Sequence, residues 1–350
     1  MYAFLIEADG SAKNLEGDTI FISFERFKNN ICKNGHCFVC GAAPNKNFNN
    51  EHIFPDWLLT YCGLHGKSLT LPNGNLVKYS TYKIPCCAPC NSRLAEIYET
   101  PISKIIKSGL DGLIEFVRNG GKPLLCSWLS LIFTKIHLRD FLNPDTLDKR
   151  NQAKMIGDHF DLNDLHHAHA LARASTAGVS VDERVFGSLF IIGNTYTEDG
   201  LTFDYADNLH SQTMMMQFND FALIYVLNDC GATAGMLSKQ LKVLPQHLSD
   251  IQLREVYARF ATANLHLKKR PSFRTELIGA PKIQVELPPF EIHDYVPEVF
   301  GNMLAGCLGN YLETILIEGK TGTEAIEIIK TGKISFLFDE SGKPISEVKK

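Results

Sequence analysis

The sequence has 350 residues, of which 45% are hydrophobic and 21% are charged, and its formal net charge is −4. This balance is typical of a globular protein of about two domains and excludes a disordered chain. The near-even mixture of acidic and basic residues excludes a protein covered in positive charge, although a locally basic face still allows nucleic-acid binding.

The N-terminal third has strand and helix patterns around a region that has neither. In chain order we expect strands at 2–6 and 19–27, a short helix at 54–62, a hairpin-like excursion at 66–79 and a helix at 91–108. Pro101 interrupts the last pattern, so we expect a kink or break there. Residues 29–50 are rich in Cys, Asn and Gly, so something other than a hydrophobic core must organise them.

The rest of the chain predicts further helices and strands. They are helices at 124–141 and 161–175, strands at 185–192, 211–218 and 221–228, helices at 232–242, 249–266, 298–316 and 322–330, and a strand near 333–338. We expect an α+β protein with a module at 1–110, a boundary between Gly109 and Lys122, and a larger α+β accessory domain at 111–350. That domain has no recognised catalytic motif, and recognition, regulation and oligomerisation remain open for it.

No stretch reaches the roughly 18 uninterrupted apolar residues that a membrane span needs. Glu7 and Asp9 come too early for a secretory signal peptide. We therefore expect a soluble, cytoplasmic protein without a membrane partner.

Two Cys-x-x-Cys units frame the N-terminal region, Cys37 with Cys40 and Cys87 with Cys90. This spacing lets two thiolates of one tight turn bind the same zinc ion, and two such turns complete a closed, structural site. We expect this zinc to replace the missing hydrophobic core. Three nearby residues remain alternative ligands: Cys32, His36 and Cys86.

Between the two cysteine pairs lies Glu51-His52-Ile53-Phe54-Pro55, and Asn91 directly follows the second pair. The combination resembles the HNH endonuclease family, in which an acidic residue and His-Ile-x-Pro lie between two Cys-x-x-Cys units. The resemblance covers residues 30–100. It implies a zinc-stabilised ββα-metal module, in which a β-hairpin and a helix hold one divalent metal ion.

The resemblance implies that His52 is the general base of a phosphodiester hydrolase. Glu51 and Asn91 would bind the catalytic metal. This chemistry is coherent, because a neutral imidazole can take a proton from water near pH 7, and a cation beside the phosphate offsets developing charge. Carboxylate and amide oxygens suit Mg²⁺ or Mn²⁺, whereas thiolates suit zinc.

Arg93 and Lys83 flank this site and are candidates for phosphate contact, although surface solvation explains them nearly as well. Residues 1–110 contain eleven Lys and Arg against nine Asp and Glu, a small excess that favours phosphate binding. The family resemblance favours DNA over RNA. It also suggests phage defence as a setting, with a homo-oligomer or a defence-system protein as a partner.

The chain departs from the family at the middle asparagine, which orients the base histidine in many members. The expected spacing falls on Thr81, Tyr82 and Lys83, and the nearest asparagines upstream are Asn73 and Asn75. The alternative function is therefore a zinc-stabilised module that binds nucleic acid or protein without cleavage.

His166 and His169 lie three residues apart, which places them on one face of the expected helix. A metal-binding pair is conceivable, but no carboxylate accompanies them. An ordinary polar helix face is the simpler interpretation.

Overall fold

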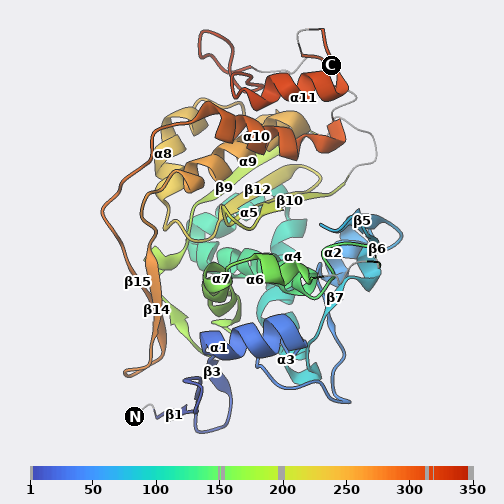
Figure 1. The fold of residues 1–350 in the computed structure, drawn as a ribbon. Coiled ribbons are helices and arrows are strands. Elements are labelled where there is room, and N and C mark those ends of the chain that lie inside the picture. The colour runs from blue at the N-terminus through green and yellow to red at the C-terminus, as the bar shows by residue number, and fades with distance from the viewer. Residues whose placement is uncertain are drawn as a thin grey trace. The chain divides into compact units, whose positions relative to one another are not determined.

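The computed structural model describes residues 3–148, 150, 154–195, 202–311, 315–317 and 319–345 (Figure 1). The chain forms two compact units, each assembled from separate stretches. Unit 1 comprises Met1–Ser108, Glu115–Val185 and Phe273–Glu286, and unit 2 comprises Gly109–Ile114, Phe186–Ser272 and Leu287–Lys350. The mixture of helix and sheet confirms the α+β expectation, whereas a nuclease module within residues 1–110 remains a prediction about function.

The strands of unit 1 are short and form small separate sheets. They are β1 (Leu5–Ile6), β2 (Ala12–Lys13) and β3 (Thr19–Phe21) in one sheet, β4 (Glu51–His52) with β7 (Lys83–Ile84), β5 (Ser68–Thr70) with β6 (Leu76–Lys78), and β14 (Ser272–Glu276), β15 (Lys282–Glu286) and β8 (Ser180–Val181). In the β4–β7 pair, Glu51 lies opposite Ile84 and His52 opposite Lys83. Strands this short cannot form a stable sheet alone.

Helices supply most of the regular structure of unit 1. They are α1 (Phe24–Arg26) continuing into a π segment (Phe27–Cys32), α2 (Asp56–Tyr61), α3 (Ala88–Leu94), a π segment (Ala95–Glu99), α4 (Thr100–Lys107), α6 (Lys122–Phe141) and α7 (Asn163–Arg173). Single turns lie at Tyr79–Thr81, Ile156–His159 and Glu183–Val185, and a π segment at Val117–Gly121 precedes α6.

Helix α6 is the central element of unit 1 and packs along α7 (Figure 1). Apart from its first turn and Arg139, its residues are buried. A helix that is apolar nearly all round belongs in a core. One of its buried residues, Lys135, carries a charge and has no exposed surface, so it requires a partner inside the protein.

Unit 2 is built on one five-stranded sheet with strand order β10-β11-β12-β9-β13. The strands are β9 (Leu189–Thr195), β10 (Asp204–Asn208), β11 (Thr213–Gln217), β12 (Phe221–Val226) and β13 (His247–Ser249). Helix α9 (Asp250–Leu265) supplies Leu253, Val256 and Phe260 to the core that covers this sheet. Further helices are α5 (Gly109–Phe116), which straddles the division between the units, α8 (Ala232–Leu241), α10 (Pro297–Cys307) and α11 (Gly322–Lys330), with a single turn at Gly309–Tyr311.

Several expected elements differ from those observed. The strand expected at 19–27 ends at Phe21, because Ser23 accepts a hydrogen bond from the Arg26 amide and starts a helix. The prediction of a strand near 333–338 is wrong, since the only strand pairing there among the described residues is an isolated bridge between Phe338 and Pro344. Strands β10, β14 and β15 were not expected.

Pro101 does not break its helix, contrary to expectation. Residues 88–107 are helical throughout, and Pro101 lies in the first turn of α4, directly after the π segment Ala95–Glu99. The π segment accommodates the proline inside the helix, because hydrogen bonding shifts there to i→i−5, as in the bond from the Thr100 amide to the Ala95 carbonyl. None of the helices in the described part of the chain has the length and apolar character to cross a bilayer.

Candidate metal centre and neighbouring residues

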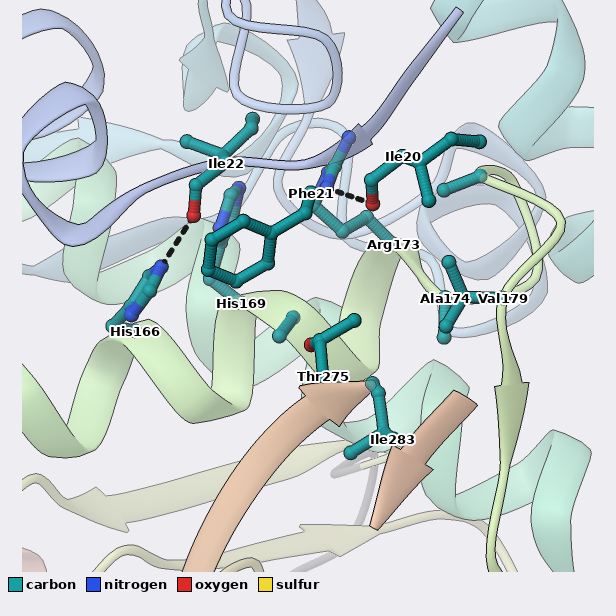
Figure 2. Close-up of a pocket in the computed structure, with 12 residues that line it drawn as sticks. Ile20, Phe21, Ile22, His166, His169, Arg173, Ala174, Val179, Thr275 and Ile283 are labelled. Carbon is teal, nitrogen blue, oxygen red and sulfur yellow. Dashed lines mark hydrogen bonds between the residues drawn. The ribbon is translucent and has the colours of Figure 1, made fainter. Parts of the chain in front are cut away.

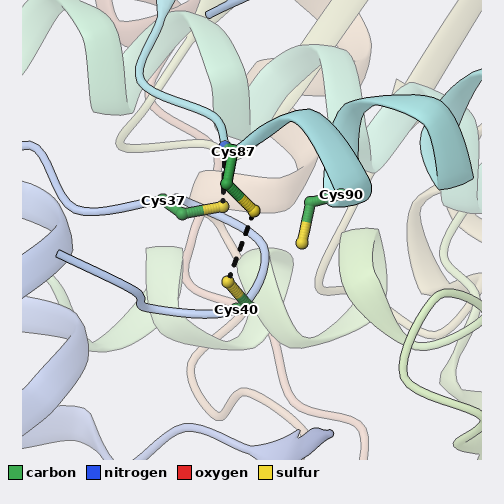
Figure 3. Close-up of side chains that lie close together, drawn as sticks. All are labelled: Cys37, Cys40, Cys87 and Cys90. Atoms are coloured by element: carbon green, nitrogen blue, oxygen red, sulfur yellow. Dashed lines mark hydrogen bonds between the residues drawn. The ribbon is translucent and has the colours of Figure 1, made fainter. Parts of the chain in front are cut away.

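Four cysteines converge in unit 1 as the spacing predicts (Figure 3). The sulfur atoms of Cys37, Cys40, Cys87 and Cys90 all lie within 4.8 Å of one another, and those of Cys40 and Cys87 are 3.8 Å apart. Tetrahedral zinc with Zn–S bonds of about 2.3 Å separates its sulfurs by about 3.8 Å. The quartet can therefore hold a metal ion such as zinc.

Local backbone structure brings each pair together. Cys87 precedes the first residue of α3 and Cys90 lies one turn into it, so both sulfurs point to the same side (Figure 3). The first pair lies in a turn closed by Gly41, which has φ +74° and donates its amide to the Cys37 carbonyl. Glycine adopts this left-handed conformation without the steric cost that other residues meet.

The three alternative ligands lie outside this quartet. Burial raises the pKa of Cys32 to about 12, so its thiol stays protonated. The Nδ1 atom of His36 lies 3.0 Å from the Gly41 carbonyl oxygen, and the Cys86 thiol donates toward the Cys87 carbonyl. Within the part of the chain that the structure describes, the four predicted cysteines are the cluster close enough together to hold one metal ion.

His52 is half-buried on β4 and has a defined orientation. Its Nε2 lies 3.2 Å from the carbonyl oxygen of Ser80, which can only accept, so Nε2 carries the proton and Nδ1 is the basic nitrogen. Burial, followed by the positive charge of Lys83, lowers the pKa of His52 below its ordinary value of 6.5. The imidazole is therefore neutral at pH 7, as a general base must be.

Glu51 lies on the other face of β4 and its side chain is buried. Its Oε1 accepts a hydrogen bond from Lys135 Nζ at 3.0 Å, and the same ammonium donates to the His52 carbonyl oxygen at 2.7 Å. The Glu51 Oε1 atom and the His52 carbonyl oxygen are thus both bound to the ammonium of Lys135. Sequence reasoning missed Lys135, although a lone lysine inside an apolar helix signals a buried ion pair.

Glu99, a half-buried residue, adds a second carboxyl group beside this ion pair. Burial, followed by the negative charge of Glu51, raises the pKa of Glu99 to about 8. Its Oε1 has no hydrogen-bond partner among the described residues. The ammonium of Lys135 is bound to Glu51, and burial together with the negative charge of Glu51 outweighs the attraction of Lys135, so the protonated form of Glu99 is favoured at neutral pH.

Asn91 lies on α3 next to the residues that precede β4. Its Nδ2 donates to the Asn49 side chain at 3.0 Å and to the Asn50 carbonyl oxygen at 3.2 Å. These bonds join the start of α3 to the strand that carries Glu51 and His52. The amide thus acts as a tether between helix and strand.

The two candidate phosphate contacts differ in setting. Lys83 is half-buried opposite His52 in the β4–β7 pair. Arg93 is exposed and borders an open cavity of about 310 Å³ that Glu16 and Asp18 also line. Those carboxylates disfavour an anion there, so Lys83 is the better placed of the two to meet a phosphate near His52.

Three candidates for the middle asparagine of the HNH pattern form hydrogen bonds that lead away from His52. Thr81 donates to the Lys78 carbonyl, the Tyr82 hydroxyl donates to Asp140, and Asn73 donates to the Pro144 carbonyl. The Ser80 carbonyl orients the imidazole instead. A backbone group leaves no signature in the sequence, so this role was not predictable.

No family model, curated protein or solved structure matches this chain.

Proposed function

We propose that this chain is a metal-dependent endonuclease of the HNH type that hydrolyses phosphodiester bonds, with DNA as its preferred substrate. One observation carries the proposal. The cysteine quartet joins the turn at 37–40 to the start of α3. On α3, the Asn91 side chain lies 3.2 Å from the carbonyl oxygen of Asn50. Asn50 precedes His52 by two residues, and the imidazole of His52 is neutral and oriented by the Ser80 carbonyl. In this reading the metal in the quartet is a structural zinc ion.

In the proposed reaction Nδ1 of His52 takes a proton from the attacking water. The water oxygen forms a bond to phosphorus and the bond to the leaving sugar oxygen breaks. Lys83, opposite His52, attracts the phosphate. A Mg²⁺ or Mn²⁺ ion bound by Glu51 and Asn91 would supply positive charge beside the phosphate. The expected partners and a setting in phage defence stay predictions.

The test is plasmid cleavage by the zinc-loaded protein in Mg²⁺ or Mn²⁺. We expect His52→Ala to lower the cleavage rate about 10²- to 10⁴-fold, the usual worth of a general base. His65→Ala is the matched control, because His65 is an exposed imidazole outside the site. Equal cleavage by wild type and His52→Ala would refute the assignment, provided that both proteins retain zinc.

A second candidate is a zinc-stabilised nucleic-acid-binding module that does not cleave. The observation that favours it is the ammonium of Lys135, bound to both Glu51 Oε1 and the His52 carbonyl oxygen. A divalent ion at Glu51 would have to displace this buried cation. Replacement of one partner in a buried ion pair costs about 3–5 kcal/mol, so displacement is unfavourable unless the metal repays that cost.

Manganese binding separates the two candidates. Electron paramagnetic resonance counts the Mn²⁺ ions bound by wild type, Glu51→Gln and the exposed control Glu96→Gln. An endonuclease of the proposed type binds one Mn²⁺ that only Glu51→Gln abolishes. The second candidate binds duplex DNA, shows no Mn²⁺ site that depends on Glu51, and loses no DNA affinity in His52→Ala.

A further inference from the structure

Helix α7 presents three donor side chains to backbone carbonyls of the N-terminal segments, and Figure 2 shows two of these bonds, from His166 to Ile22 and from Arg173 to Ile20. His166, His169 and Arg173 are spaced at i, i+3 and i+7, which places them on one helix face. Nε2 of His166 lies 2.8 Å from the Ile22 carbonyl oxygen, and Nε2 of His169 lies 2.5 Å from the Phe38 carbonyl oxygen. The histidine row is therefore neither a solvated helix face nor a metal pair.

Arg173 makes the most extensive of these contacts. Its guanidinium donates to the carbonyl oxygens of Val39 at 2.7 Å, Ile20 at 3.1 Å and Thr19 at 2.7 Å. Phe38 and Val39 are the two residues between Cys37 and Cys40. Helix α7 thus holds both middle residues of the first Cys-x-x-Cys turn by their carbonyl groups.

The charge of Arg173 has no carboxylate to balance it. Its three hydrogen-bond acceptors are neutral carbonyls, and among the described residues no Asp or Glu forms an ion pair with it. The side chain is buried, with 6% of its surface exposed. The guanidinium is linked to the cysteine quartet through the backbone, because it binds the carbonyl of Val39, the residue directly before Cys40. A buried cation without a compensating charge is strongly destabilising.

A zinc ion bound by four thiolates has a formal charge of −2, because four negative sulfurs outweigh one divalent cation. We propose that Arg173 is the internal counter-charge of a tetrathiolate zinc centre, and that its fork also fixes the first cysteine turn in the metal-binding conformation. Arg173 is then a positioning residue for the metal. Its positive charge and the negative charge of the zinc–thiolate centre each offset the cost of burying the other. This inference does not depend on nuclease activity.

The test measures how tightly the full-length protein holds zinc, by competition with the chromogenic chelator 4-(2-pyridylazo)resorcinol. We expect Arg173→Gln to lower zinc affinity about 10- to 100-fold, the usual effect of losing an outer-shell partner of a metal site. Arg173→Lys keeps the positive charge but lacks the planar guanidinium with its several donors, so a smaller loss of zinc affinity is expected. Arg150→Gln is the matched control, because Arg150 is exposed and bound to Asp148, and no change is expected there.

Zinc affinity in Arg173→Gln within twofold of wild type would overturn the proposal. Equal losses in the Lys and Gln variants would overturn the counter-charge and leave only the positioning of the turn. The Co²⁺-substituted proteins give a second measurement, since the sulfur-to-cobalt absorption band reports the thiolates directly. If Arg173→Gln does not fold, the Lys variant decides: an affinity close to wild type supports the counter-charge, and a 100-fold loss refutes it.

Discussion

The proposed hydrolysis depends on the ionisation state of one side chain, the imidazole of His52. Burial and the neighbouring ammonium of Lys83 both disfavour its charged form. A base of this kind is active above its own pKa and becomes protonated below it. The acid limb of kcat/KM for cleavage should therefore lie below pH 6.5.

Lys83→Gln tests this electrostatic coupling. Removal of the positive charge is expected to raise the pKa of His52, so the acid limb should move to higher pH. Proton NMR titration of the imidazole measures the same shift without any need for cleavage. Lys78→Gln, an exposed lysine on β6, is the control. An unchanged pKa, or a shift to lower pH, would contradict the expectation.

Residue identities were predictable where local spacing alone determines them. Each Cys-x-x-Cys pair is built within one turn, and the need of one metal ion for four ligands predicts that the two pairs meet, as they do. Lys135 and Arg173 were not predictable, since they act on Glu51 and Val39 across more than 80 residues of chain. A single sequence does not show such contacts, although the requirement of a buried charge for a partner was available as a warning.

Among the elements, the π segment Ala95–Glu99 ends on the unusual carboxyl group of Glu99. Its pKa of about 8 in the folded protein exceeds the ordinary value of 4.5. The folded state therefore binds more protons than the unfolded state between these two values, and the free energy of unfolding falls as pH rises through this window. Below pH 4.5 the group contributes no penalty.

Glu99→Gln should remove this dependence, because the amide does not ionise. Between pH 5 and pH 8, we expect the free energy of unfolding of the variant to rise by roughly 1–2 kcal/mol relative to that of wild type. This is well under the energy that corresponds to the whole pKa shift of Glu99, because the side chain is only half-buried. Urea unfolding at both pH values measures the difference. Glu96→Gln, in the same π segment but exposed, should show no gain, and an equal effect of Glu99→Gln at both pH values would argue against the assignment.

Element types were largely predictable where the apolar period is long. Helices α6, α8 and α9 lie close to the expected ranges because their patterns span several turns. The short strands of unit 1 were less predictable, since two or three residues carry no period. The edge strand β10 was missed because all five of its positions are half-buried, which leaves no alternation. Strand β15 does alternate, as Lys-Ile-Gln-Val-Glu, and was overlooked.

At the scale of the whole molecule, metal removal should act on one unit. The quartet lies in unit 1, where small sheets leave much of the structure to the metal and to α6 and α7, whereas the sheet of unit 2 has its own apolar core. Structural zinc contributes about 10–16 kcal/mol of binding free energy in small zinc peptides, which becomes folding free energy. Chelation should therefore unfold unit 1 preferentially.

Hydrogen exchange with mass spectrometry measures this selectivity. After treatment with 1,10-phenanthroline, peptides from β4, α3 and α7 should lose protection, while peptides from β12 and α9 keep it. Cys87→Ser should reproduce the pattern without chelator. Uniform loss of protection across both units, or none in unit 1, would contradict a metal that stabilises this unit alone.

The return of the chain to unit 1 at Phe273–Glu286 bears on how the protein is made. A ribosome releases the cysteine quartet early, then the arginine of α7, and the strand β15 that pairs with β8 only after the segment 186–272 has emerged. Metal loading can thus precede completion of the unit that it stabilises. Nascent chains stalled before residue 273 should already retain zinc, yet remain sensitive to protease around Ser180, where the partner strand has not yet been synthesised.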